Sequence, residues 1–131
     1  MADIQAHFTL IGKTFDTQLV TERTGIMPSW VRQKDEVLKN GRFFGHTEWG
    51  IETEMFCTDD ALPVIEQLSS LITSKPDTLK EVANECNAEW NILFSIDIRN
   101  EDAPAIYFPA KFIEFCGEIS ATIGFEVTPK S

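Results

Sequence analysis

Residues 88–98 read AEWNILFSIDI, and in this stretch large apolar side chains alternate with polar ones. Successive side chains of a β-strand point to opposite faces of a sheet, so the pattern predicts a strand that is buried on one face only. The apolar side is expected to carry Trp90, Ile92, Phe94, Ile96 and Ile98. The opposite side is expected to carry Glu89, Asn91, Ser95 and Asp97. A sheet built around this strand is therefore expected to have one face buried in the core and one face exposed to solvent.

Three further segments, 3–12, 46–55 and 119–127, show the same alternation and are predicted strands. Their apolar sides carry Ile4, Ala6, Phe8 and Leu10; Trp49, Ile51, Thr53 and Met55; and Ile119, Ala121, Ile123, Phe125 and Val127. Their polar sides carry Asp3, Gln5, His7 and Thr9; His46, Glu48, Glu52 and Glu54; and Ser120, Thr122, Gly124 and Glu126. Residues 105–108 predict a short returning strand, and residues 30–31 a short extended piece.

Two segments between these strands have the spacing of helices. Asp16 is suited to cap a short helix, which Gly25 would end. A longer helix is predicted near residues 60–73, with Thr58 or Asp59 as its cap. Its apolar stripe is formed by Ala61, Ile65, Leu68 and Ile72, and Leu62, Val64 and Leu71 are expected to widen it.

Two prolines predict where the later helices begin, because proline is favoured in the first turn of a helix. Pro76 begins a helix that reaches about Cys86, and Pro109 begins one that Gly117 ends. The helices have apolar stripes on one side, and the strands have one apolar face. Both requirements are met by an α+β two-layer sandwich, in which a mostly antiparallel sheet of about five strands has helices on one face, in the general style of ferredoxin-like folds. No linker interrupts the pattern, so residues 1–131 are expected to form a single domain.

The charge of the chain is distributed unevenly. The formal net charge is −10; residues 1–42 hold six basic and five acidic residues, whereas residues 43–131 hold five basic and sixteen acidic ones. Such an excess is typical of a solubilising surface, and it also suits a face that binds a basic partner. It disfavours nucleic acids and anionic membranes as partners.

The cysteines and the N-terminal residues bear on the cellular compartment. Cys57, Cys86 and Cys116 form no CxxC pair and lie in apolar contexts, so buried reduced thiols are expected. No apolar run is long enough to span a membrane, and the first residues show no targeting pattern. These features favour a cytoplasmic protein.

Several landmarks follow one another in the order found in a known bacterial family. They are Phe8 on the first strand, Asp16, Val20-Thr21, Gly25-Ile26, Pro28, Lys34-Asp35 and Trp49. Through them the chain resembles the bacterial domain of unknown function 4279 family over nearly its whole length, although that family usually has Lys-Gly at Lys34-Asp35. The resemblance implies an α+β fold and a small stand-alone protein, and it suggests a role like that of an immunity protein. It implies no catalytic residue.

The two histidines are the first candidates for acid/base or metal chemistry. His7 and His46 both fall on the predicted polar face, together with Glu48 and Glu52. If their strands are neighbours, the four side chains could converge into a metal or acid/base site. A polar sheet face also carries such residues without any such role, and this second interpretation is favoured, so neither a metal site nor a cofactor is predicted.

The loop at 28–49 combines aromatic and basic residues. Trp30, Arg32, Lys34, Arg42 and Trp49 are its candidate binding residues. Aromatic rings beside arginine or lysine can hold a planar or anionic ligand, and they can also anchor a protein interface. The competing interpretation is that the rings close the edge of the core while the charges stay solvated.

The leading hypothesis is a non-enzymatic binding protein that acts through contact with a protein partner, as an immunity protein or an inhibitor does. The alternative is a domain that binds a small anionic or aromatic ligand with the loop at 28–49. An enzyme with a His/carboxylate site assembled in space is third, and it is disfavoured because the sequence has no GxSxG elbow and no Gly-rich phosphate loop. A strand edge that stays exposed could also pair two copies into a homodimer.

Overall fold

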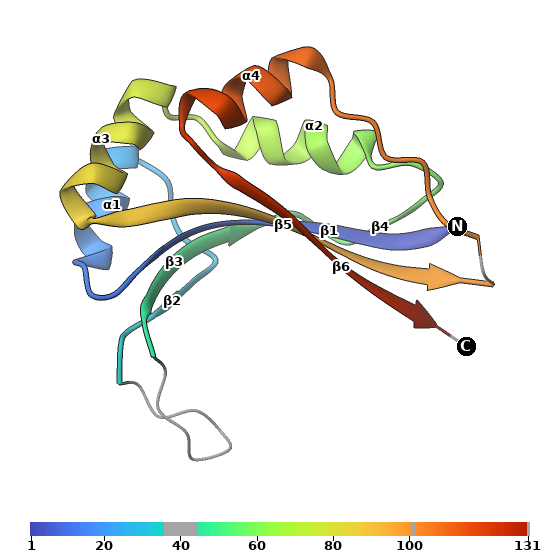
Figure 1. Cartoon of the computed structure of the whole chain (residues 1–131), viewed down its shortest axis with the longest axis horizontal. Coiled ribbons are helices and arrows are strands. Elements are labelled where there is room, and N and C mark those ends of the chain that lie inside the picture. Colours follow the sequence, from blue (N-terminus) through green and yellow to red (C-terminus); the bar gives the residue numbers. More distant parts are fainter. Residues whose placement is uncertain (36–44, 101, 131) are drawn as a thin grey trace.

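The computed structural model describes residues 1–35, 45–100 and 102–130, and a sheet forms one of its two layers (Figure 1). The sheet is made of the six strands β1 (Ala2–Gly12), β2 (Trp30–Arg32), β3 (Thr47–Glu52), β4 (Phe56–Thr58), β5 (Ala88–Arg99) and β6 (Thr122–Lys130). The strands lie in the order β2-β3-β1-β5-β6, and β4 pairs with the beginning of β1. Only β5 and β6 are parallel neighbours, so the predicted mostly antiparallel sheet is confirmed.

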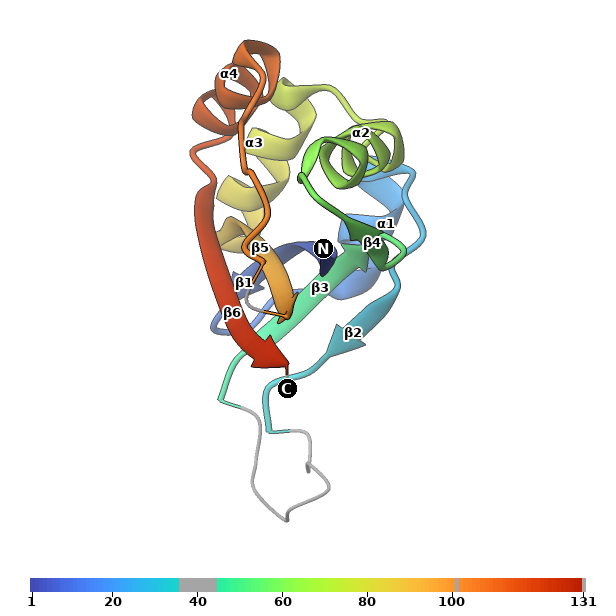
Figure 2. The same ribbon diagram turned by 90° about the vertical axis from the view of Figure 1, so that its right-hand side faces the viewer.

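The helices in the described residues all lie on one face of this sheet (Figures 1 and 2). They are α1 (Thr17–Thr24), α2 (Leu62–Leu71), α3 (Pro76–Cys86) and α4 (Ala110–Glu118). At the start of α1, Asp16 Oδ1 accepts hydrogen bonds from the N–H groups of Gln18 at 2.9 Å and Leu19 at 3.4 Å. Gly25 ends α1 in the left-handed conformation, with φ at 69°. The predicted α+β two-layer sandwich is confirmed.

The core lies between the helices and the apolar face of the sheet. Phe8, Trp90 and Phe94 expose none of their surface. The ring of Phe8 stacks on Trp90 with 4.4 Å between centroids, and Trp49 meets Trp90 edge-on at 5.9 Å. Because burying apolar surface stabilises a fold by roughly 25 cal/mol per Å², this face provides most of the stabilisation.

The segment that leads from β5 to α4 differs from the predicted strand at 105–108. Ala105 forms one isolated parallel bridge with Asp60, and the rest of the segment is irregular. Pro104 and Pro109 flank it, and proline lacks the N–H group that a strand ladder needs. The additional strand is instead β4, which at three residues is too short to show an alternating pattern.

The beginning of α2 lies two residues later than predicted. The helix starts at Leu62, and Asp60 Oδ1, rather than Thr58 or Asp59, accepts a hydrogen bond of 2.8 Å from the Leu62 N–H group. Leu62 and Leu71 are 44% and 38% exposed, so they do not widen the buried stripe as expected. The buried stripe consists of Val64, Ile65 and Leu68.

The end of α4 also differs from the prediction. The helix continues through Gly117 to Glu118, and Ser120 takes the left-handed conformation with φ at 55°. Ile119 was predicted to begin the last strand, but it packs into the core at the helix end and β6 starts at Thr122. Residues 119–121 are therefore not part of the strand, because they form the turn that leads from α4 to β6.

The cysteines are not all buried. Cys86 and Cys116 are buried, and burial raises the pKa of both thiols, that of Cys116 to about 11. Cys57 is exposed, contrary to the prediction, because it pairs with Asp3 in the ladder and so lies on the sheet face without helices. Among the described residues, no helix is both long enough and apolar enough to cross a membrane.

Candidate functional site

The sheet face turned away from the helices, here called the open face, is not covered by any other described element (Figure 1). Strand register places the side chains of alternate residues on it in rows. One row contains Glu52, His7, Leu93 and Gly124. The next row contains Trp30, Gly50, Thr9 and Asn91. His7, Glu52, Thr9 and Asn91, which were predicted for the polar face, thus lie on the open face. The same rows place the predicted Trp30 beside His7.

Trp30 lies flat against the sheet because Gly50, opposite it on β3, has no side chain. A Cβ atom built on Gly50 would lie 2.3 Å from Trp30 Cζ2, so only glycine leaves room for the ring. The indole Nε1 donates a hydrogen bond to Glu48 Oε1 at 3.2 Å. The ring stays half-buried, and Thr9, the next residue in the same row, is only 7% exposed. Trp30 is therefore held as a fixed aromatic surface on the open face.

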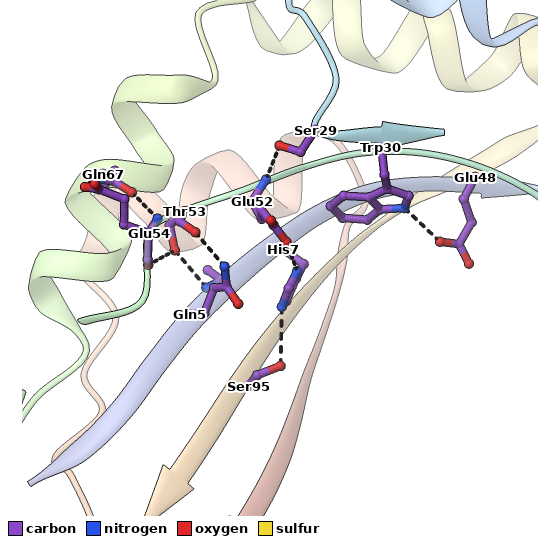
Figure 3. Close-up of polar contacts among 11 residues, drawn as sticks. Gln5, His7, Ser29, Trp30, Glu48, Glu52, Thr53, Glu54, Gln67 and Ser95 are labelled. Carbon is purple, nitrogen blue, oxygen red and sulfur yellow. Dashed lines mark hydrogen bonds and ion pairs between the residues drawn. The ribbon is translucent and has the colours of Figure 1, made fainter. Parts of the chain in front are cut away.

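His7 stands beside Trp30 and between two polar groups on neighbouring strands (Figure 3). Its Nδ1 lies 3.4 Å from Glu52 Oε2, and its Nε2 lies 3.4 Å from Ser95 Oγ. The His7 and Trp30 rings meet edge-on with 5.9 Å between centroids. The order carboxylate, imidazole and hydroxyl is that of a catalytic triad, although both contacts are longer than a tight hydrogen bond.

His46 pairs with a different carboxylate. Its Nε2 lies 2.9 Å from Glu48 Oε2, and Glu48 thereby contacts both His46 and Trp30. Since a strand rises about 3.3 Å per residue, Glu48 and Glu52 are roughly 13 Å apart along β3. The two histidines and two glutamates therefore do not converge into the single cluster that the sequence analysis considered but did not favour. They form two separate pairs on either side of Trp30, and no group of three or more potential metal ligands occurs among the described residues.

The far end of the open face carries a second set of charges. Asp3 and Asp97 are directly opposite each other on β1 and β5. Arg99 donates to Asp3 Oδ2 from its Nε at 3.0 Å, and this hydrogen bond together with the nearby carboxylates raises the pKa of the Arg99 guanidinium. The bridge relieves repulsion between the two aspartates but leaves the face acidic as a whole.

Carboxylates outnumber cationic groups among the described side chains of the open face. The acidic residues of this face are Asp3, Glu48, Glu52, Glu89, Asp97 and Glu126. The arginines are Arg32, directly opposite Glu48 on β2, and Arg99. The electrostatic field of the open face therefore attracts a cationic partner and repels an anionic one.

The predicted residues of the loop at 28–49 that the structure describes do not form one group: Trp30 and Arg32 lie on the open face, whereas Trp49 lies on the opposite one. Trp49 exposes none of its surface, and its Nε1 donates to Thr21 Oγ1 at 3.0 Å, so its predicted role in binding is wrong. Its neighbours on β3 face the opposite way, and the period-two alternation already indicated this. Arg32 is exposed on β2, and the Lys34 N–H group donates to Thr47 Oγ1 at 3.2 Å. Arg42 lies outside the described residues.

Sequence reasoning missed Gly50 and Leu93 on the open face, and it placed Ser95 on this face without its contact to His7. Gly50 makes room for the Trp30 ring, Ser95 contacts His7, and Leu93 adds an apolar side chain between His7 and Gly124. The alternation that placed Ser95 on this face could have placed Leu93 there as well. Their neighbours across the sheet depend on strand order, which alternation does not determine.

A separate hollow of about 450 Å³ lies at the end of the sheet, away from Trp30. It is lined by residues of α3, the start of β5 and the turn after α4, among them Lys80, Asn84, Asn87, Glu89 and Ser120. Because the lining contains one cationic side chain, one anionic side chain and several amides, it does not indicate whether a ligand would be positively or negatively charged. None of the predicted binding residues lines this hollow.

A model of one protein family matches residues 2–130, and its description is Domain of unknown function (DUF4279). No curated protein and no solved structure matches the chain. The match confirms the family resemblance and covers nearly the whole chain. The family description names no activity. The geometry of the open face is therefore the basis for any functional conclusion.

Proposed function

We propose that this protein is a non-enzymatic binding protein whose open face contacts a basic protein partner. The proposal proceeds from the finding that the chain belongs to the family described as Domain of unknown function (DUF4279). An inhibitor of that partner, comparable to an immunity protein, is the concrete form of this proposal. The observation that carries it is the position of Trp30 on an acidic sheet face that no other described element covers, where Glu48 and Gly50 hold the ring.

Trp30 has the properties of an interface anchor. Tryptophan is enriched among residues that dominate binding energy, because it supplies a large rigid surface at little cost in side-chain entropy. The hydrogen bond to Glu48 and the close contact with Gly50 hold the ring in place before binding. A fixed ring loses little freedom when a partner docks, so more of the contact energy remains as affinity.

The charge around Trp30 indicates the chemistry of the partner. Glu48 lies on one side of the ring, and Glu52 lies beyond His7 on the other. A lysine or arginine of the partner could place its cation over the indole while it pairs with either carboxylate. Electrostatic attraction of this kind also speeds association and weakens as salt is added.

Catalysis by Ser95 is not proposed, despite its contact with His7. Attack on a carbonyl group requires N–H donors aimed at the oxygen that becomes negative. Here β1 and β5 are paired along both of their edges, so their backbone N–H groups belong to the ladder. A shallow hollow beside the site is lined by Glu52 but by neither His7 nor Ser95. Small-molecule binding by the loop at 28–49 stays a prediction.

The proposal is tested by quantitative pull-down from the native host, with tagged wild-type protein and the variant Trp30→Ala. We expect a partner of high isoelectric point whose recovery falls by at least about tenfold for Trp30→Ala, because Trp30 is the interface anchor. Recovery should also fall when salt is raised from about 50 mM to about 500 mM.

Two further variants separate binding from folding. Met27→Ala removes an apolar side chain that is 81% exposed and lies outside the open face, so it should bind as wild type does. Glu48→Gln keeps the shape of the side chain and removes its charge, so it should weaken binding without unfolding the protein. If all variants recover the same proteins in the same amounts at both salt concentrations, the open face is not the binding surface.

A further inference from the structure

The two edge strands of the sheet differ in how well they are protected against pairing with another chain. The edge strand β2 has three residues and ends with the charged Arg32. The opposite edge strand, β6, has nine residues, and no described strand pairs with its outer side. A long edge strand is a site where a further strand can add, because its outer backbone N–H and C=O groups are unpaired. Glu126 is a charged residue near the middle of β6, so any such pairing must place it opposite an uncharged residue.

Apolar side chains are exposed along β6 on the side of the helices. Phe125 is 47% exposed and Val127 is 53% exposed. Phe125 continues a row of rings that begins in the core, since it stacks on Phe94 at 5.7 Å and on Phe108 at 6.1 Å between centroids. The helices cover this face at Phe94 but not at its outer edge. The apolar side chains on the helix side of the sheet therefore become exposed to solvent at the edge strand β6.

We propose that β6 pairs in antiparallel fashion with β6 of a second copy of this chain, with the two-fold axis at Phe125. This register places Phe125 beside its own copy and Ile123 opposite Val127, so the apolar layer continues from one copy to the other. On the other face, Gly124 lies opposite Glu126 and Thr122 opposite Thr128. The strand is thus complementary to itself, which is the reason for choosing a second copy as the occupant.

Neighbouring registers fit less well. A two-fold axis at Glu126 places two like charges directly opposite each other, which is destabilising. An axis at Gly124 places Ala121 opposite Val127 and leaves Phe125 opposite the smaller Ile123. Only the axis at Phe125 pairs the bulkiest exposed side chain with itself and the glutamate with a glycine.

The dimer does not depend on the proposed binding of a basic partner, because it uses the edge of the sheet rather than the open face. Each copy has a net charge of −10, so the copies repel each other over distance. Added salt screens this repulsion and strengthens an apolar contact between copies, whereas it weakens binding of a basic partner. The two proposals therefore have opposite salt dependences.

The test is the mass of the full chain in solution, measured by sedimentation equilibrium over a range of concentrations and at low and high salt. We expect a dimer of twice the 14.8 kDa chain mass that becomes tighter as salt rises. Val127→Lys should raise the dissociation constant by roughly tenfold or more, because each copy would place an ammonium group against Ile123 of the other. Ile113→Lys is the matched control, since Ile113 is an equally apolar residue, 56% exposed, on α4.

A cross-link checks the register independently of these variants. In a Cys57→Ser background, which removes the exposed native thiol, Phe125→Cys should form a disulfide between copies on mild oxidation, and Ile113→Cys should not. Circular dichroism shows whether each variant is folded. A monomer under all conditions, a dimer that Val127→Lys leaves unchanged, or equal cross-linking at 113 and 125 would each overturn the proposal.

Discussion

The two faces of the sheet are built from the same strands but are constrained very differently. On β1 and β5, Phe8 and Phe94 face the helices and expose none of their surface. Their immediate neighbours, His7 and Ser95, face the open side and stay half-buried. Each residue of the covered face must fit closely packed surroundings, whereas a residue of the open face must fit only its neighbours in the row. Stability therefore depends on one face, and the other is available for binding.

The sharpest test of this difference is Trp90→Ala on the covered face. The substitution removes a fully buried ring that stacks on Phe8, and it leaves the Leu79 C=O group without the 2.8 Å hydrogen bond from Trp90 Nε1. We expect the free energy of unfolding to fall by about 3–5 kcal/mol, as for other large core truncations. Chemical denaturation followed by circular dichroism measures this change.

Trp90→Phe is the control that keeps an aromatic ring in the core. It should cost less than Trp90→Ala, and the remaining loss of about 1–3 kcal/mol reflects the lost hydrogen bond to the Leu79 C=O group and the smaller ring. A loss below about 1 kcal/mol for Trp90→Ala would mean that the covered face is not the main source of stability.

The covered face could be predicted from the sequence because it depends only on local period. The alternation in residues 88–98 identifies Trp90 and Phe94 as buried, and both are. The caps of α1 were also predictable, since Asp16 and Gly25 act within one turn of chain. Helix ends near Gly117 were not, because the packing of Ile119 decides where α4 stops.

The contacts of the open face could be predicted only in part. Alternation places His7 and Glu52 on the same face, but their contact requires β1 to lie beside β3. Contact with Ser95 requires β5 on the other side of β1. The position of Trp30 depends on its being opposite Gly50, a feature of register rather than of composition. Long-range order of this kind is not contained in a periodic pattern.

The second prediction concerns the open face, where Gly50→Ala should have a smaller but specific effect. The added Cβ would lie 2.3 Å from Trp30 Cζ2 and must push the ring away from the sheet. We expect a loss of about 1–3 kcal/mol, in the range for overpacked sites. In a Trp30→Ala background the same substitution should cost little, because the indole ring with which the added methyl group would clash is absent. Denaturation of the four proteins of this double-mutant cycle gives the coupling energy.

A coupling energy of about 1 kcal/mol or more would show that Gly50 matters through Trp30. Equal losses from Gly50→Ala in both backgrounds would contradict this and would indicate that alanine disturbs β3 itself.

The smallest effect on stability is expected for Glu52→Gln. The side chain of Glu52 is 44% exposed, and its contact with His7 is 3.4 Å long. Partly exposed ion pairs of this kind contribute little, so the free energy of unfolding at neutral pH should stay within about 0.5 kcal/mol of wild type. The same substitution should weaken capture of the proposed basic partner, because it removes the negative charge that contacts His7 next to Trp30. If Glu52→Gln instead destabilised the fold as much as Gly50→Ala, the open face would be part of the structural framework, and the division between a stabilising face and a binding face would fail.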